Sequence, residues 1–200
     1  MYHSYVLLDY NMLRQANHVA DDMEERKIMR LFHVSEEPSI KVFHPRLPRR
    51  AELDPSIGLV WSLTEPALPN WLFPRDCPRI GYRICDNTNP TDMAKFFASG
   101  AHHVVAIEND WHERQLNAML YVYEFDPANF YYDEIAGFYI SQKSETPIDM
   151  VTYTNLYAEL FKRDTEVRLV NNLWLLRDEV FASSLTSWSF CKMANAKPRL

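Results

Sequence analysis

The stretch MRLFHVSEEPSIKVF, residues 29–43, marks a change in the pattern of the sequence. Arg30–Val34 and Ile40–Phe43 are rich in aromatic and β-branched residues, which are typical of short strands. Between them lies Ser35-Glu36-Glu37-Pro38, whose serine and proline are typical of a turn. The stretch therefore predicts two short strands joined by a turn, and the rest of the chain continues in the same way.

Further strand-like segments follow toward the C-terminus. They are predicted at 58–62, 79–85, 102–107, 119–125, 137–141, 166–170 and 187–193. A short helix is predicted at 89–100, and a second is predicted to begin at Asp149 and to end near Arg163. Because strands and helices do not alternate regularly, the sequence predicts an α+β fold with a mostly antiparallel mixed sheet and two to four short helices.

Residues 1–28 have a different, helical pattern. Apolar residues recur at three- and four-residue spacing and predict one helix over 6–27; they are Val6, Tyr10, Leu13, Ala16, Ala20 and Met23. We therefore expect residues 1–28 to be an N-terminal helical extension of a single α+β domain at 29–200. Its apolar face must be buried either against that domain or against a second copy, which makes a homodimer one expectation.

The composition excludes several classes of protein and function. The chain has 200 residues, of which 47% are hydrophobic and 24% charged, as in ordinary globular domains. Its net charge of −6 disfavours binding to nucleic acid or to an anionic membrane. Its three cysteines lack C-x-x-C spacing, so neither a disulfide framework nor a structural metal site is expected. Free thiols and the lack of an export signal predict a cytoplasmic location.

Common catalytic motifs are missing from the sequence. Its four glycines are isolated, so neither the dinucleotide-binding G-x-G-x-x-G nor the phosphate-binding G-x-x-x-x-G-K pattern occurs. The metalloprotease motif H-E-x-x-H and the hydrolase motif G-x-S-x-G are missing as well. Any chemistry must therefore come from less familiar combinations of residues.

The first such combination is Leu31-Phe32-His33-Val34-Ser35. On a strand, His33 and Ser35 point to the same face and could present an imidazole and a hydroxyl to a ribose or a carbonyl group. The alternative is a half-buried histidine beside a serine that caps the following turn.

The second combination is Phe73-Pro74-Arg75-Asp76-Cys77-Pro78-Arg79. Its prolines stiffen the loop, and the planar guanidinium groups of Arg75 and Arg79 suit phosphate or carboxylate. The alternative is an ion pair of either arginine with Asp76 that orders the loop. We do not expect Cys77 to be a nucleophile, because no histidine lies close to it in sequence.

Two further features lie near these combinations. Trp61 and Trp71 flank the turn at Thr64 and lead into Arg75, so they are candidates to line a pocket. A basic run between 41 and 50 holds no acidic residue and could steer an anionic ligand, although such a run is more often a solvated loop; it contains Lys41, His44, Arg46, Arg49 and Arg50.

From Met29 onward the chain resembles an uncharacterised family of small bacterial proteins, a domain of unknown function. The resemblance rests on Leu31–Pro38, Pro69–Arg79, Ser183-Ser184-Leu185 and Lys192–Ala196. It covers most of the chain and brings no known activity with it.

A second resemblance is more limited and more specific in mechanism. Leu31-Phe32-His33-Val34-Ser35 is similar to the opening strand of ADP-ribosyltransferase-like folds, which begin L-[YF]-H-x-[ST]. The resemblance implies that His33 holds the nicotinamide ribose of NAD and that Val60-Trp61-Ser62, with Thr64 just beyond, is the second strand of the site. It also implies a glutamate that stabilises the oxocarbenium-like state, for which Glu145 is the candidate and Glu108 and Glu134 are rivals.

Together these observations favour a protein with an NAD- or nucleotide-binding pocket, and they leave open whether it is an enzyme. His33 and Ser62 would hold the ribose, Arg75 and Arg79 the phosphates, and Trp61 or Trp71 the base, with Glu145 acting at the anomeric carbon. The alternative is a non-catalytic interaction module that forms a homodimer through its N-terminal helix.

Overall fold

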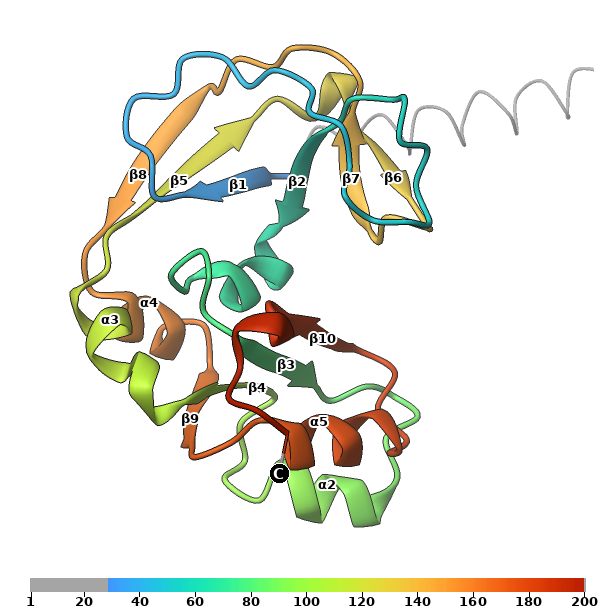
Figure 1. The fold of residues 1–200 in the computed structure, drawn as a ribbon, viewed down its shortest axis with the longest axis vertical. Helices are drawn as coiled ribbons and strands as arrows, with labels where there is room; N and C mark the ends of the chain where they lie inside the picture. Colours follow the sequence, from blue (N-terminus) through green and yellow to red (C-terminus); the bar gives the residue numbers. More distant parts are fainter. Residues whose placement is uncertain (1–28, 200) are drawn as a thin grey trace, which may run out of the picture. The chain divides into compact units, whose positions relative to one another are not determined.

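A computed structural model describes residues 29–199, so the helix predicted over 6–27 lies outside the described residues (Figure 1). The described chain divides into two compact units. The first unit contains residues 29–32, 41–65 and 124–148, and the second contains 33–40, 66–123 and 149–199. Each unit is assembled from segments that are distant in sequence. The assignment of 29–200 to a single domain stays a prediction.

The first unit is built on antiparallel strands in the order β6-β7-β2-β1. These are β6 (Tyr131–Asp133), β7 (Phe138–Ser141), β2 (Val60–Thr64) and β1 (Leu31–Ser35), of which β1 continues into the second unit. In the register, Leu31 lies opposite Thr64, and Val60 lies opposite Ser141. Gly137 has φ +70° in the turn before β7, a backbone conformation that favours glycine.

Apolar side chains on one face of this sheet form the core of the first unit. Leu53, Leu59, Ala136 and Ile140 are buried together, and Trp61 and Phe138 pack against them. A second group consists of three phenylalanine rings: the centroid of Phe125 lies 5.0 Å from that of Phe43 and 5.2 Å from that of Phe130. The strand predicted at Ile40–Phe43 is reduced to a single antiparallel bridge between Phe43 and Glu145.

The second unit contains a four-stranded sheet in the order β10-β3-β4-β9. Its strands are β10 (Trp188–Cys191), β3 (Arg79–Arg83), β4 (His103–Glu108) and β9 (Thr165–Val170). All pairs are antiparallel except β4 with β9, which are parallel. Every residue of β4 is buried, which agrees with its continuous apolar run of Val104 to Ile107.

Helices α2 (Pro90–Phe96) and α5 (Trp174–Phe181) cover one face of this sheet (Figure 1). They enclose a core that includes Tyr82, Phe96, Phe97, Val104, Leu173 and Val180. Helix α2 begins as predicted, because the side chain of Asn89 accepts the backbone N–H of Asp92 and Pro90 stands at the first helical position. This helix was therefore encoded by local signals.

The prediction of a helix beginning at Asp149 is wrong. Residues Asp149–Tyr153 form the strand β8, and the helix α4 spans Leu156–Phe161. The β-branched pair Val151-Thr152 favours the strand. The true cap is Asn155, whose side chain accepts the backbone N–H of Ala158.

The remaining elements are short. They are the strand β5 (Leu120–Phe125), the helix α3 (His112–Asn117) and the 3₁₀ helices η1 (Glu65–Trp71), η2 (Asn109–Trp111), η3 (Pro127–Asn129) and η4 (Met193–Asn195). The fold is thus α+β, as the sequence predicts. Within residues 29–199, no helix is both long and apolar enough to cross a membrane.

Candidate functional site

The glutamate that the sequence singles out, Glu145, is anchored in the first unit. Its backbone exchanges two hydrogen bonds with Phe43, of 2.8 Å and 2.9 Å, and its side chain is buried. The Oε1 atom accepts a hydrogen bond from Ser141 Oγ at 2.5 Å, and the Oε2 atom accepts one from Asn129 Nδ2 at 3.3 Å. Both carboxylate oxygens therefore have a side-chain donor, which fixes the orientation of the group.

The hydroxyl groups predicted to contact ribose lie on the same sheet face as Ser141. Val60 lies opposite Ser141 in the antiparallel register of β2 with β7, so their side chains share one face. Ser62 and Thr64 follow Val60 at two-residue spacing and share that face. Ser62 is buried, and its hydroxyl donates to the carbonyl oxygen of Tyr139 at 3.1 Å.

Strand geometry places Trp61 on the other face of β2. Its indole packs edge-on against Phe138, with ring centroids 5.7 Å apart, next to the buried Ile140. Trp61 and Ser62 are neighbours in sequence and were predicted to line one site, but successive side chains of a strand point to opposite faces of the sheet. Its contacts in the structure are those of a core residue.

Three residues around Glu145 are not apparent from sequence reasoning. Ser141 and Lys143 lie at two- and four-residue spacing in the segment that ends at Glu145, and this local spacing is the one signal that could have indicated them. Asn129 belongs to η3 and is 16 residues from Glu145, so no sequence pattern connects the two. The site around Glu145 therefore depends on tertiary structure.

His33 and Ser35 lie at the end of β1 that belongs to the second unit. Alternation along the strand gives them the same face, as predicted. The His33 side chain is half-buried, and the Ser35 Oγ atom accepts the backbone N–H of Glu37 at 3.0 Å. Ser35 thus caps the turn after β1, which is the structural alternative for this residue.

Arg79, on β3 in the second unit, is buried, and its guanidinium group is held by carbonyl oxygens. Its Nε donates to Asn70 O at 2.5 Å, and its Nη1 donates to Cys77 O at 2.9 Å. The same group lies 5.2 Å from the centroid of the Trp71 ring and 5.8 Å from that of Phe73. These contacts order the 70–79 loop. Phosphate binding by Arg79 stays a prediction.

Arg75 is exposed at the surface of the same loop. Its backbone N–H donates to the Glu36 carboxylate at 3.0 Å, which connects the loop to the turn after β1. The neighbouring Asp76 has its carboxylate 3.6 Å from Lys192 Nζ, and its carbonyl oxygen accepts Asn195 Nδ2 at 2.8 Å. Two of the sequence segments that carry the family resemblance, Pro69–Arg79 and Lys192–Ala196, are therefore in direct contact.

The centre of the second unit contains a buried histidine that the sequence does not single out. His103 Nε2 lies 2.9 Å from Asn70 Oδ1, and burial together with the charge of Arg83 lowers the pKa of His103 to about 4. The nearby Cys77 is fully buried, and burial raises the pKa of its thiol to about 12. A thiol with this pKa is a poor nucleophile, in agreement with the expectation from sequence.

The two rival glutamates have different surroundings. Glu108 is buried, and its carboxylate accepts the backbone N–H groups of Leu173 and Lys197, at distances from 3.0 to 3.3 Å. It ties segments of the second unit together. Glu134 is exposed in the turn between β6 and β7.

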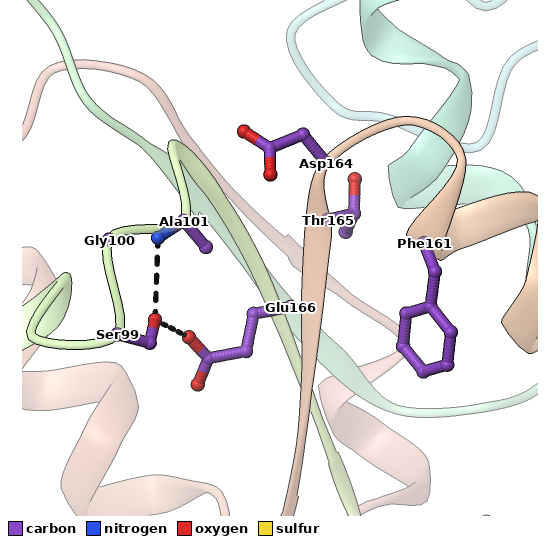
Figure 2. A pocket seen from close by; sticks show the side chains of 7 residues that line it. All are labelled: Ser99, Gly100, Ala101, Phe161, Asp164, Thr165 and Glu166. Atoms are coloured by element: carbon purple, nitrogen blue, oxygen red, sulfur yellow. Dashed lines mark hydrogen bonds between the residues drawn. The ribbon is translucent and has the colours of Figure 1, made fainter.

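A hollow of about 320 Å³ lies elsewhere in the second unit, at the start of β9 (Figure 2). Figure 2 shows Ser99 and Glu166 pointing toward one another, and Ser99 donates a hydrogen bond to Glu166. Glu166 also pairs with Arg168 at 2.5 Å, and Asp164 lies 3.1 Å from His102. The charged groups of this hollow already have partners, and the residues predicted from the sequence do not line it.

A comparison with protein families matches residues 32–196 to a family of unknown function, DUF6886. The chain belongs to this family. The match covers most of the chain and confirms the resemblance to an uncharacterised family that the sequence segments indicate. Neither the curated proteins nor the solved structures contain a match to the chain.

Proposed function

We propose that this DUF6886 protein binds a nucleotide of the NAD class and that Glu145 acts in cleavage of its N-glycosidic bond. The observation that carries the proposal is the buried carboxylate of Glu145, which has a donor on each oxygen and lies beside a sheet face that carries the hydroxyls of Ser62 and Thr64. The likeness of Leu31–Ser35 to the opening strand of ADP-ribosyltransferase-like folds supports it independently.

The physical argument concerns charge at the ribose. Cleavage of the bond between the ribose C1′ and the nicotinamide nitrogen leaves positive charge at C1′, while the bonding electron pair departs with neutral nicotinamide. A fixed carboxylate stabilises that charge without having to reorient during the reaction. Water then adds to C1′ through its oxygen and releases a proton to solvent, so that the products are nicotinamide and ADP-ribose.

The other residues have supporting roles in the proposal. In the first unit, Ser62 holds a ribose hydroxyl. The roles of His33, Trp71, Arg75 and Arg79, which belong to the second unit, stay predictions from the sequence. A cytoplasmic location belongs to the same proposal, because three free thiols suit a reducing compartment. The bacterial origin implied by the resemblance is part of the proposal as well.

The first experiment measures binding to the full chain. We expect NAD and ADP-ribose to raise the melting temperature, since a ligand at 100 times its Kd adds about 2.7 kcal/mol to the stability of the native state. ATP lacks the second ribose of NAD and ADP-ribose, and nicotinamide riboside lacks the diphosphate, so these two compounds, tested in parallel, show whether both groups are needed. If no nucleotide of this set changes the melting temperature, the proposal is wrong.

The second experiment measures nicotinamide release from NAD by chromatography. We expect Glu145→Gln to keep NAD binding within about threefold and to lose ~100-fold or more in rate, because the amide carries no negative charge. Glu134→Gln is the matched control, since it makes the same change at an exposed glutamate of the same unit. Equal rates for Glu145→Gln and the unmodified chain would exclude Glu145 from catalysis.

A further inference from the structure

Both donors to the Glu145 carboxylate are held by one residue, Lys143. Its backbone N–H donates to Ser141 Oγ at 3.1 Å, and its Nζ donates to Asn129 Oδ1 at 2.9 Å. Ser141 and Asn129 in turn donate to the two oxygens of Glu145. These four hydrogen bonds form a closed ring through Lys143, Ser141, Glu145 and Asn129.

The ring determines which way each donor points. An asparagine amide can present either its oxygen or its NH₂ group to a neighbour. The ammonium of Lys143 occupies the Asn129 oxygen, so the NH₂ group faces Glu145. The Lys143 N–H likewise occupies the Ser141 oxygen as an acceptor, which directs the hydroxyl proton to Glu145.

We propose that Lys143 is the positioning residue of this site: it fixes Asn129 and Ser141 so that both present hydrogens to the Glu145 carboxylate. The inference rests on the function proposed for Glu145. Lys143 itself is exposed and does not contact the carboxylate in the structure, so it acts through its two neighbours. Without the Lys143 ammonium, the Asn129 amide loses the hydrogen bond that anchors its oxygen, so it can move away from Glu145 and leave the carboxylate with one side-chain donor.

Three variants of the full chain separate the parts of the ring. Lys143→Met removes the ammonium and keeps both the aliphatic chain and the backbone N–H that holds Ser141. Lys143→Arg keeps a charged donor for Asn129. Lys162→Met is the matched control, because Lys162 is another exposed lysine with a side-chain partner, Glu159 at 2.7 Å, in the other unit.

For nicotinamide release, we expect Lys143→Met to lower kcat by ~10- to 100-fold and to leave KM within about twofold, because a displaced catalytic group costs rate more than binding. Lys143→Arg should recover most of the rate, and Lys162→Met should match the unmodified chain. A residue that contributes stability alone would give no such division between kcat and KM and no recovery by arginine. Unchanged kcat in Lys143→Met would overturn the inference.

A measurement that needs no activity keeps the two proposals distinguishable. We expect the side-chain amide NMR signals of Asn129 to shift in Lys143→Met and to stay in place in Lys162→Met. If the unmodified chain neither binds nor cleaves NAD but the Asn129 signals shift, the proposed function fails while the positioning by Lys143 holds. If the chain is active and the Asn129 signals do not move, the positioning by Lys143 is wrong.

Discussion

Replacement of Gly81 by alanine would place a methyl group against the side chain of Asn70. A Cβ atom at Gly81 would lie 2.0 Å from Asn70 Oδ1, 2.7 Å from its Cγ and 3.2 Å from its Nδ2. Atoms do not approach so closely, so the Asn70 amide must move away. It would then lose its 2.9 Å hydrogen bond to the buried His103.

The magnitude follows from the two opposing effects. A buried polar group left without its hydrogen bond costs about 1–3 kcal/mol. Alanine in place of glycine within a strand stabilises the folded state by ~0.5–1 kcal/mol, because the unfolded chain with alanine loses less conformational entropy on folding. We therefore expect Gly81→Ala to lower the free energy of unfolding by up to about 2.5 kcal/mol, which in urea lowers the midpoint by up to roughly 1 M.

The decisive assay is a double-mutant cycle followed by tryptophan fluorescence in urea. The three nearest atoms to the added methyl all belong to the Asn70 amide, so Asn70→Ala removes the clash. In that background we expect Gly81→Ala to be neutral or stabilising by ~0.5–1 kcal/mol. An equal loss of stability in both backgrounds would refute the reasoning, because Gly81 would then be required for a reason unrelated to Asn70.

The remaining predictions test the buried groups of the second unit. The pKa of His103 is about 4 in the folded chain, whereas its ordinary value is 6.5, so the unfolded chain takes up the proton at a higher pH. The free energy of unfolding should therefore fall by up to about 3 kcal/mol as the pH is lowered from 6.5 to 4. His103→Asn should remove that slope, whereas the same change at the exposed His102 should keep it; urea unfolding at several pH values measures both. Arg79→Lys should cost about 1–3 kcal/mol of unfolding free energy, because lysine lacks the planar fork by which Nε and Nη1 of Arg79 donate to two separate carbonyl oxygens. Arg75→Lys should stay within ~0.5 kcal/mol, and similar values for the two variants would contradict the contacts described for Arg79. Cys77 has a thiol pKa of about 12 and is fully buried, so it should react with a disulfide reagent only after unfolding, while Cys85 and Cys191 react in the native state. Fast reaction of all three thiols in the native state would show that the 70–79 loop opens.

The sequence predicted those elements whose signals are local. Helix α2 has its cap, Asn89, and its first-position proline, Pro90, next to each other, so its start could be predicted closely. Its end could not, because the helix ends at Phe96, before the predicted terminal glycine, Gly100. The strand β8 could not, because Met150, Tyr153 and Tyr157 have the three- and four-residue apolar spacing of a helix. Pairing with a neighbouring strand decides such cases, and pairing is a property of the tertiary structure.

The same distinction applies to the candidate site. His33 and Ser35 were correctly assigned to one strand face, because alternation follows from the sequence alone. The contacts of Arg79 with the Trp71 ring and with two carbonyl oxygens could not be predicted in this way, because these partners are brought together by the tertiary structure. Residue type indicates which groups can bind an anion, and only packing decides whether they are already used.

The two buried glutamates illustrate how the structure separates groups that the sequence treats as equivalent. Glu108 is held by backbone N–H groups, which belong to the segments at Leu173 and Lys197 and give the carboxylate the task of joining them. Glu145 is held by side-chain donors, Ser141 in its own segment and Asn129 in η3, and these two donors orient the carboxylate. Burial of a carboxylate costs free energy. Buried carboxylates are therefore expected where the group connects parts of the fold or where its negative charge is needed for function. Because the donors of Glu145 are side chains, and because Lys143 in turn orients them, the second explanation fits Glu145 better than Glu108.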